Sequence, residues 1–216
     1  GPGTVVDRLL DVIDELLKVA RSRGVSLEGI GVGVAGAVDP EKGTMLPHAG
    51  NALPELAHLP LAEDIRRVTG LRAFVDNDAN ALALAEWRFG VGRGAHSLAL
   101  FALGTHVGGG VIMSDALIRG YKGYAGELHA LPINFHSPTC PSFGRGCLGD
   151  YVGGRAIAAE ARQQVETGSG DVLLDLAGRD ASNITSELVF RAARGGDPLA
   201  KVIVDRACEA LAAGIG

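Results

Sequence analysis

The sequence predicts an α/β fold in which helices cover a sheet, arranged as two lobes. Strand-like and helix-like patterns alternate through residues 29–89, and such alternation is typical of a sheet covered by helices. Two more strand-like segments follow back to back after residue 96, and helix-like patterns fill most of the last third. The composition agrees with a folded domain, because 47% of the 216 residues are hydrophobic and 21% are charged.

The chain begins with a helix and a glycine-rich strand. Apolar residues in the segment 4–23 recur at steps of three and four, which predicts an amphipathic helix that ends at Gly24. Glycine alternates with branched apolar residues in the segment 29–34, which predicts a strand that neighbouring backbone can approach closely. Residues 36–40 break this strand and are predicted to form a loop.

Three further elements complete the first lobe. The patterns predict a short helix over residues 61–69, a strand over 71–76 and a helix rich in Ala and Leu over 78–89. The pattern changes near Gly94, where we place the boundary between an N-terminal lobe, residues 1–94, and a C-terminal lobe, residues 95–216.

The second lobe opens with two strands, predicted over residues 97–103 and 110–113. Residues 120–150 then show little periodicity and much Gly, Pro, His and Cys, and so long an irregular stretch is typical of a functional loop. Asp197 and Pro198 suit the cap and the first turn of a helix. Helices are predicted over residues 152–166, 186–194 and 198–213.

Charge and hydropathy exclude several function classes. A net charge of −5 and a pI near 5.7 argue against a broad nucleic-acid surface, because phosphate binding needs clustered Lys and Arg. The longest apolar runs fall far short of the roughly 18 residues that a membrane helix needs, and no signal peptide opens the chain. We therefore expect a soluble, cytoplasmic protein with no membrane partner and no direct nucleic-acid contact from this segment.

The strongest catalytic candidate is the polar run DNDAN at residues 76–80. It follows a hydrophobic strand and opens a helix, and open α/β sheets bind ligands at the carboxyl ends of their strands. A carboxylate there can accept a proton from a substrate hydroxyl that attacks phosphorus. Alternatively, Asn77 or Asp78 only caps the helix by accepting hydrogen bonds from its first N–H groups.

A second candidate is the glycine-rich turn LGTHVGGG at residues 103–110. Glycine permits positive φ and leaves the backbone uncovered, so several N–H groups can converge on an anion. A glycine-rich hairpin without a ligand is the alternative. The spacing matches neither the Walker A pattern nor the dinucleotide fingerprint, so a phosphate site here requires a different fold.

A third candidate is a metal site formed by Cys140 and Cys147 with His129, His136 or both. Structural zinc takes four tetrahedral ligands from Cys and His, which this loop could supply. Solvated histidines and unpaired cytosolic thiols are the alternative. The remaining cysteine, Cys208, lies on a helical pattern and is predicted to be a small buried residue.

The order and spacing of these motifs resemble the ROK family, which groups bacterial sugar kinases with sugar-responsive repressors. GVGVAGAVD at residues 31–39 resembles the family's glycine-rich strand beside the sugar, and VDNDANA at 75–81 resembles its catalytic segment. Residues 103–111 are similar to its second phosphate loop and residues 126–127 to the start of its G-E-x-G-H motif. Residues 140–148 are similar to its cysteine motif.

The resemblance implies an actin-like ATPase (ribonuclease H-like) fold, with two lobes around a cleft that holds a sugar and, above it, ATP with Mg²⁺. It implies that Asp78 is the general base on a sugar hydroxyl. Sugar hydroxyls would be held by Asn51, Asn77 and Glu127. Nucleotide phosphates would be held by Gly104, Thr105, Gly108 and Gly109. A homodimer is also implied, as is a zinc site with Cys140, Cys147 and His129 as candidate ligands.

The sequence departs from the family pattern at several positions. The family histidine that follows Glu127 by three residues is Ala130 here, and the imidazole stands one position earlier. Ser142 replaces a cysteine of the zinc motif, and Gly149 replaces a sugar-binding glutamate. His106 replaces a glycine of the phosphate loop. Sugar choice, zinc binding and turnover can therefore all differ from the family pattern.

The resemblance leaves three hypotheses for function. The leading one is a sugar kinase that transfers the γ-phosphoryl group of ATP to a hexose or amino-hexose hydroxyl. The second is the sugar-sensing domain of a repressor whose helix-turn-helix is not in this chain, and the third is an inactive homologue that stabilises a partner. The chain starts after the family's first, Asp-containing strand and stops before its adenosine-binding turn, so we expect an incomplete ATP site.

Overall fold

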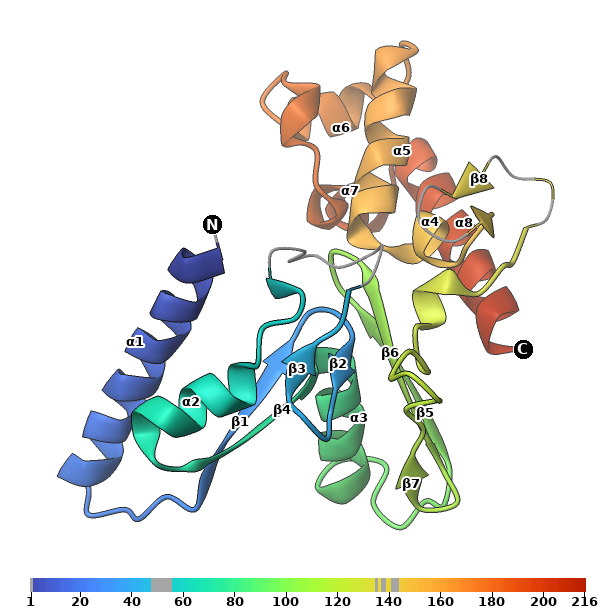
Figure 1. Cartoon of the computed structure of the whole chain (residues 1–216). Helices are drawn as coiled ribbons and strands as arrows, with labels where there is room; N and C mark the ends of the chain where they lie inside the picture. The colour runs from blue at the N-terminus through green and yellow to red at the C-terminus, as the bar shows by residue number, and fades with distance from the viewer. Residues whose placement is uncertain (1, 48–55, 135, 137–138, 141–143) are drawn as a thin grey trace. The chain divides into compact units, whose positions relative to one another are not determined.

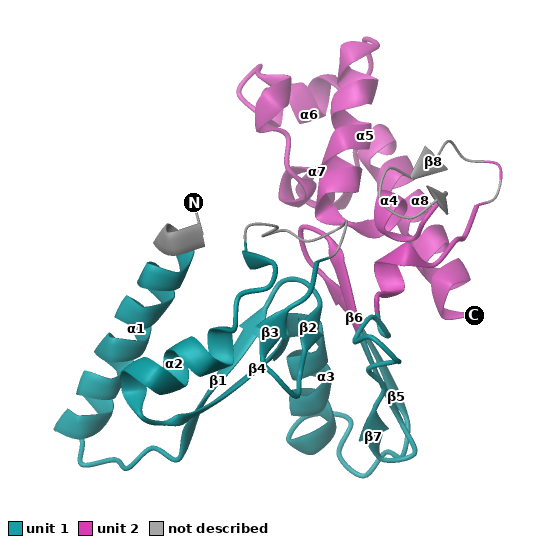
Figure 2. Ribbon diagram, viewed as in Figure 1, with its two compact units in different colours: residues 1–100, 110–126 teal, residues 101–109, 127–216 magenta. Residues whose placement is uncertain are grey.

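The computed structural model describes residues 2–47, 56–134, 136, 139–140 and 144–216, with the backbone alone for residues 2–4, 139–140 and 144–145. Two compact units make up the chain (Figure 2). Unit 1 comprises Gly1–Leu100 and Gly110–Gly126, and unit 2 comprises Phe101–Gly109 and Glu127–Gly216. The lobe boundary near Gly94 stays a prediction. No helix within the described ranges is long and apolar enough to cross a membrane.

Unit 1 is built around two parallel strands, β1 (Gly29–Val34) and β4 (Arg72–Asn77) (Figure 1). Their register runs from Gly29 opposite Arg72 to Val34 opposite Asn77, so both strands end at the same edge. Helix α2 (Leu61–Thr69) packs against β4, α3 (Asp78–Arg88) packs against both strands, and α1 (Pro2–Ser22) contacts α2. The helices and strands predicted for these residues are confirmed, with small differences at their ends.

A short antiparallel hairpin, β2 (Val38–Asp39) and β3 (Thr44–Met45), follows β1. The predicted break after β1 is confirmed, but Val38 and Asp39 within the predicted loop form a strand, which is too short to show an alternating pattern. Val38 and Met45 are buried in the core of unit 1. The hairpin therefore places the chain that follows β1 against that core.

The turn of this hairpin is organised by Asp39. Its Oδ1 accepts hydrogen bonds from the N–H groups of Lys42, at 3.2 Å, and Glu41, at 3.1 Å. The Lys42 ammonium lies 3.4 Å from Asp39 Oδ2. The hydrogen bond from the Lys42 N–H, together with the contact to its ammonium, holds the pKa of Asp39 below its usual value of 3.8.

The lowered pKa of Asp39 predicts a contribution to acid stability. A carboxyl group with a depressed pKa stabilises the folded state above its unfolded pKa, and this contribution is lost as the pH falls through the folded pKa. We expect Asp39→Asn to lose less stability than wild type between about pH 7 and about pH 3. Thermal midpoints at both pH values measure this, with Glu41→Gln as the control, and equal losses in wild type and Asp39→Asn would contradict it.

The strands that follow form a three-stranded sheet in the order β5-β6-β7. The strands are β5 (Leu98–Leu103), β6 (Val107–Met113) and β7 (Ala116–Leu117). The predicted start of the second strand at residue 110 was wrong, and Gly108 and Gly109 lie in β6 because glycine also adopts extended backbone. Their contact with a phosphate stays a prediction. Gly110 permits close packing on α3, since a Cβ there would lie 3.0 Å from Ala79 O.

Unit 2 is mainly helical, as predicted. Its helices are α4 (Gly149–Val152), α5 (Gly154–Glu166), α6 (Asp171–Leu176), α7 (Ser186–Arg194) and α8 (Pro198–Ile215), and its short elements are η2 (Leu128–Ala130), β8 (Thr139–Cys140), β9 (Gly144–Arg145) and η3 (Ala181–Asn183). The helix predicted over residues 152–166 is interrupted by Gly153, whose φ and ψ of −66° and 142° are extended. Helix α6 was missed because six residues are too few for a periodic pattern.

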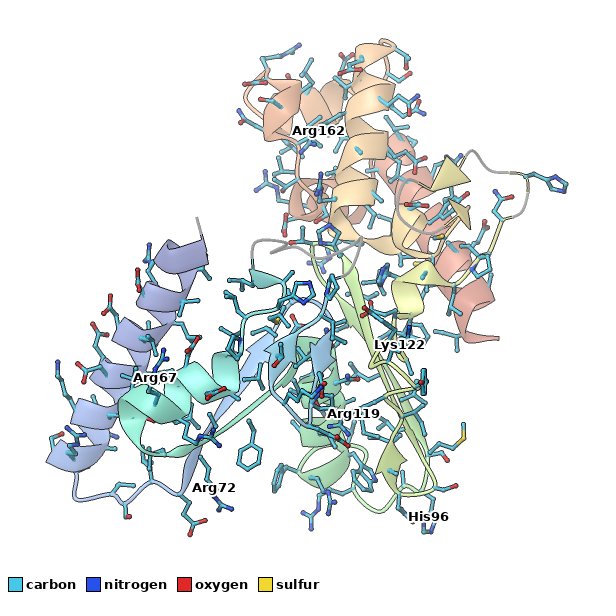
Figure 3. All side chains as sticks on the ribbon, viewed as in Figure 1. Arg67, Arg72, His96, Arg119, Lys122 and Arg162 are labelled. Atoms are coloured by element: carbon cyan, nitrogen blue, oxygen red, sulfur yellow. The ribbon has the colours of Figure 1, made fainter. Side chains whose placement is uncertain are left out.

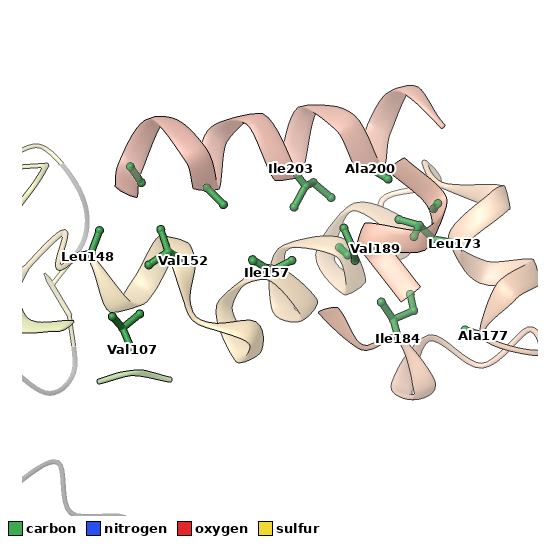
Figure 4. Close-up of a cluster of buried hydrophobic side chains, with 14 residues drawn as sticks. Val107, Leu148, Val152, Ile157, Leu173, Ala177, Ile184, Val189, Ala200 and Ile203 are labelled. Atoms are coloured by element: carbon green, nitrogen blue, oxygen red, sulfur yellow. The ribbon is translucent and has the colours of Figure 1, made fainter. Parts of the chain in front are cut away.

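The core of unit 2 lies between α4, α5, α7 and α8 (Figure 4). Leu148, Leu173, Ile184 and Val189 are all fully buried in it. The predicted cap of the last helix is confirmed, because the Asp197 carboxylate accepts a hydrogen bond from the Ala200 N–H at 2.7 Å.

The exposed Cys208 corrects another prediction. Ala200, Ile203, Ala207 and Ala210 form the buried stripe of α8. Cys208 lies beside that stripe and is exposed, so the prediction that it is buried was wrong. A helical pattern fixes which face is apolar, but a small residue at the border of that face can point to either side.

Candidate functional site

The polar run at residues 76–80 lies where β4 ends and α3 begins. Asn77 is the N-cap of α3, since its Oδ1 accepts hydrogen bonds from the N–H groups of Ala79, at 2.9 Å, and Asn80, at 3.0 Å. Its Nδ2 donates to Gly36 O at 3.1 Å, which ties the helix start to the chain after β1. The capping role is thus confirmed for Asn77, and its contact with a sugar stays a prediction.

Asp78 is the first residue of α3 and is exposed. Its Oδ1 accepts a hydrogen bond from the Ala79 N–H at 2.9 Å. Gly33 in β1 lies directly behind it, because a Cβ at that glycine would be 3.3 Å from the Asp78 Cα. An exposed carboxylate held at the end of a strand can accept a proton from a hydroxyl group that binds there.

Asp76 is partly buried, and both of its carboxylate oxygens accept hydrogen bonds from other groups of the protein. Its Oδ1 accepts hydrogen bonds from the Asn77 N–H at 2.8 Å and from Asn80 Nδ2 at 3.4 Å. Its Oδ2 accepts a hydrogen bond from Arg119 Nη2 at 2.6 Å, which forms an ion pair. Arg119 is labelled in Figure 3. Asp78 is therefore the carboxylate of this run that a ligand can reach. Sequence reasoning missed Arg119, which lies 43 positions from Asp76 and belongs to no local pattern.

The glycine turn between β5 and β6 docks on the start of α5. Gly104 O accepts a hydrogen bond from the Gly154 N–H at 2.9 Å, and Thr105 O accepts one from the Arg155 N–H at 3.0 Å. The Gly104 N–H donates to His106 O at 2.9 Å. A phosphate at this turn would therefore be held by donors other than the Gly104 N–H, and Thr105 at the exposed tip offers a hydroxyl group.

Glu127 and His129 contact each other at the η2 turn. His129 Nδ1 lies 3.1 Å from Glu127 Oε2, and the two side chains are 24% and 26% exposed, respectively. Gly149 packs against the same histidine, since a Cβ at this glycine would lie 3.1 Å from the His129 Cβ. A glutamate at position 149 would need space that His129 occupies. The two departures from the family pattern are thus linked by packing.

The predicted metal ligands are only partly described. Cys147 is buried, and its N–H donates a hydrogen bond to Asp150 Oδ2 at 3.3 Å. The Cys140 side chain and all of Asn51 lie outside the described residues. In the part of the chain that the structure describes, no three side chains of His, Cys, Asp or Glu are grouped so as to hold a metal ion. Zinc binding through Cys140, Cys147 and His129 stays a prediction, as does the sugar contact of Asn51.

Comparison with known sequences finds relatives that carry out two different functions. The ROK family model matches residues 2–216. The chain is 32% identical, over 98% of its length, to a glucokinase of Thermotoga maritima. It is 30% identical, over 96% of its length, to a xylose repressor of Caldicellulosiruptor bescii. It spans 64% of the first protein and 51% of the second, so it covers about half to two-thirds of these relatives.

Solved structures give the same pair of functions. A ROK family glucokinase from Streptomyces griseus, in complex with glucose and AMPPNP, matches 97% of this chain with a TM-score of 0.79 and 32% identity, and 66% of that chain is covered. A ROK family transcriptional regulator, a homologue of the E. coli MLC protein, matches 98% of this chain with a TM-score of 0.82 and 27% identity, and 51% of that chain is covered. The predicted α/β fold is confirmed.

Proposed function

The chain belongs to the ROK family, and from this premise we propose that it is the core of a sugar kinase. Its fold is that of the family's actin-like ATPase sugar kinases, as the resemblance implied. The relatives include both glucokinases and xylose repressors. The observation that supports the kinase is Asp78, an exposed carboxylate at the end of β4 whose neighbour Asp76 is committed to an ion pair.

In the proposed reaction, Asp78 accepts the proton of a hexose or amino-hexose hydroxyl group. The deprotonated oxygen bonds to the γ-phosphorus as the bond to the leaving ADP oxygen breaks, so the products are a sugar phosphate, ADP and a protonated Asp78 that later releases its proton. Bound ATP with Mg²⁺ supplies the phosphoryl group. This chain holds the hydroxyl oxygen in line with the γ-phosphorus and the leaving oxygen, and its Asp78 takes up the proton.

The remaining residues of the proposed site bind rather than react. Asn77 and Glu127 hold sugar hydroxyl groups, as the resemblance implies. Thr105 contributes to a phosphate site at the turn that α5 supports through its first N–H groups. In the contact between Glu127 and His129, the imidazole fixes one carboxylate oxygen of Glu127. The other oxygen can then accept a hydrogen bond from a sugar.

A sugar-sensing repressor domain is the second candidate. The match to the ROK transcriptional regulator, with a TM-score of 0.82, favours it. So does the packing of His129 against Gly149, because altered sugar-site positions are compatible with binding that needs no in-line geometry. The parent gene separates the two candidates: a winged-helix segment rich in Lys and Arg upstream of Gly1 means a repressor, and a strand with Asp-Gly-Gly near the initiating Met means a kinase.

The kinase proposal predicts sugar-dependent release of ADP. We expect the full-length protein, mixed with ATP, Mg²⁺ and a panel of hexoses and amino-hexoses, to turn over at least one sugar at a rate well above that without sugar. A coupled assay for ADP measures this, with a heat-inactivated sample as the control. Sugar binding without turnover across the whole panel would support the repressor, and neither binding nor turnover would support the inactive homologue.

A further inference from the structure

We propose that Arg119 is a positioning residue, whose ion pair with Asp76 fixes the end of β4, which carries Asp78. The pair joins this strand end to the segment 119–126 of the same unit. The proposal rests on the proposed function, because it takes Asp78 as a sugar contact.

The ion pair itself is short and partly removed from water. Arg119 Nη2 lies 2.6 Å from Asp76 Oδ2, and the two side chains are 35% and 19% exposed. A second Arg–Asp pair in the same unit, Arg67–Asp64 on α2, has nearly the same distance, 2.7 Å, but its arginine is 75% exposed. Charges that are shielded from water attract each other more strongly, so the Arg119 pair constrains its partner more than a surface pair does.

Asp76, held by Arg119, in turn fixes the start of α3 through hydrogen bonds. Its other oxygen, Oδ1, accepts hydrogen bonds from the Asn77 N–H and from Nδ2 of Asn80, which is 3% exposed. Asn77 in turn caps α3 and so fixes the first turn, where Asp78 stands. Without Arg119, the Asp76 carboxylate would be left partly buried with its charge uncompensated, and it would have to turn toward water. The cap beside it would then shift.

Two buried polar atoms of this network also have unsatisfied hydrogen-bonding capacity. Arg119 Nε and Asn80 Oδ1 are buried and lack a hydrogen-bond partner within the described residues. The ion pair with Asp76 is thus the main polar contact of the Arg119 side chain, because the buried Nε of this arginine has no acceptor in the described part of the chain. Polar groups that are buried and partly unsatisfied make a network sensitive to the loss of any member.

On the other side of the pair, the segment 119–126 lies against the β2–β3 hairpin of the same unit. Arg119 O accepts a hydrogen bond from the Ala125 N–H at 3.0 Å, which closes the segment into a loop. Gly123 has a φ of 75° and lies so close to β2 that a Cβ there would be 2.7 Å from Val38 O. The loop therefore has one defined position against the hairpin.

A third contact holds the loop near its C-terminal end. Tyr124 Oη donates a hydrogen bond to Pro47 O at 2.9 Å. The segment then ends at Gly126, whose φ of 88° turns the chain, and Glu127 follows. Arg119 anchors the opposite end of this loop through a side chain that reaches β4. Its loss would release both the loop and the strand end, so Asp78 would lose its fixed position.

Sugar affinity of the full-length protein tests this role. We expect Arg119→Met to weaken the binding of the best-bound hexose roughly tenfold or more, since misplacement of binding groups by about 1 Å is costly. The matched control is Arg67→Met, which removes a pair of nearly the same length whose arginine is exposed and should leave affinity within about twofold. Isothermal titration calorimetry with that hexose gives the dissociation constants, and thermal unfolding shows whether each variant is folded.

Two further variants distinguish positioning from general loss of structure. Arg119→Lys keeps the charge and should restore affinity to within about threefold of wild type. Asp76→Asn should weaken binding as much as Arg119→Met does, and the double variant should be no worse than either, because the pair acts as a unit. Arg119→Lys and Asp76→Asn stay informative if Arg119→Met fails to fold. Affinity within about twofold of wild type in folded Arg119→Met, or an equal loss in Arg67→Met, would overturn the proposal.

The readout also separates this proposal from the proposed function. A wild-type protein that binds sugar but releases no ADP contradicts the kinase, while the affinities of the variants still test Arg119. A wild-type protein that turns over sugar, with Arg119→Met unchanged in both affinity and kcat, contradicts the positioning role alone. A wild-type protein that binds no sugar overturns both.

Discussion

Asp78→Asn is expected to lower kcat for sugar phosphorylation by about 10²–10⁴-fold, the usual contribution of a general base. Asparagine has nearly the same shape, and its side-chain oxygen can still accept the hydrogen bond from the Ala79 N–H that Asp78 accepts at 2.9 Å. It cannot take up the proton of the sugar hydroxyl. Sugar affinity should therefore change by less than about threefold, while turnover falls. Steady-state ADP release and calorimetric titration measure the two effects separately.

Asp115→Asn is the control for this variant. Asp115 is also an exposed carboxylate of unit 1, and it pairs with His96 at 2.9 Å, outside the polar run at the end of β4. Its substitution should leave both kcat and sugar affinity close to wild type. Turnover in Asp78→Asn equal to that of wild type would remove Asp78 from the reaction, and an equal loss in both variants would indicate a general effect of charge.

Leu148→Ala is expected to have the largest effect on stability, with a loss of about 3–5 kcal/mol in the free energy of unfolding. Leu148 is 0% exposed and belongs to the core of unit 2 (Figure 4). Helix α8 lies directly on it, because a Cβ at Gly214 would be 2.9 Å from its Cδ2. Tight backbone packing on this side leaves little room for collapse around the cavity. Urea unfolding followed by circular dichroism measures the change.

The matched control is Leu176→Ala, on α6 of the same unit. Leu176 is 37% exposed, so removing its side chain opens no closed cavity, and the loss should be below about 1 kcal/mol. A loss below about 1 kcal/mol in Leu148→Ala as well would show that the region around α8 can relax into the space. That result would contradict the tight packing of α8 on Leu148.

The strands, the helices and the polar run at residues 76–80 of unit 1 could be predicted from the sequence because their signals are local. The alternation in β1 and the apolar run of β4 each report the environment of that segment alone. Asp78 could be placed at a strand end for the same reason. The sequence does not decide whether Asn77 or Asp78 is the N-cap of α3, because both residue types accept hydrogen bonds from helix N–H groups. Only the backbone decides which one stands outside the helix.

The rest depended on contacts between distant residues. The ion pair between Asp76 and Arg119 joins a strand end to a loop 43 positions away, and neither residue carries a pattern that names the other. The packing of Gly149 against His129 is similar, since two separate departures from the family pattern become one steric relation only in the fold. The start of β6 was misplaced because Gly108 and Gly109 suit a turn and an extended strand equally.

The most direct test of the kinase is the product balance with the best-bound sugar at saturation. Full-length protein, ATP and Mg²⁺ are incubated with that sugar, and the sugar monophosphate is quantified by mass spectrometry beside the ADP released. Our account predicts one sugar phosphate for each ADP in wild type and a strong decrease of both in Asp78→Asn. Saturated sugar binding with no sugar phosphate above the level of the no-protein control would contradict it.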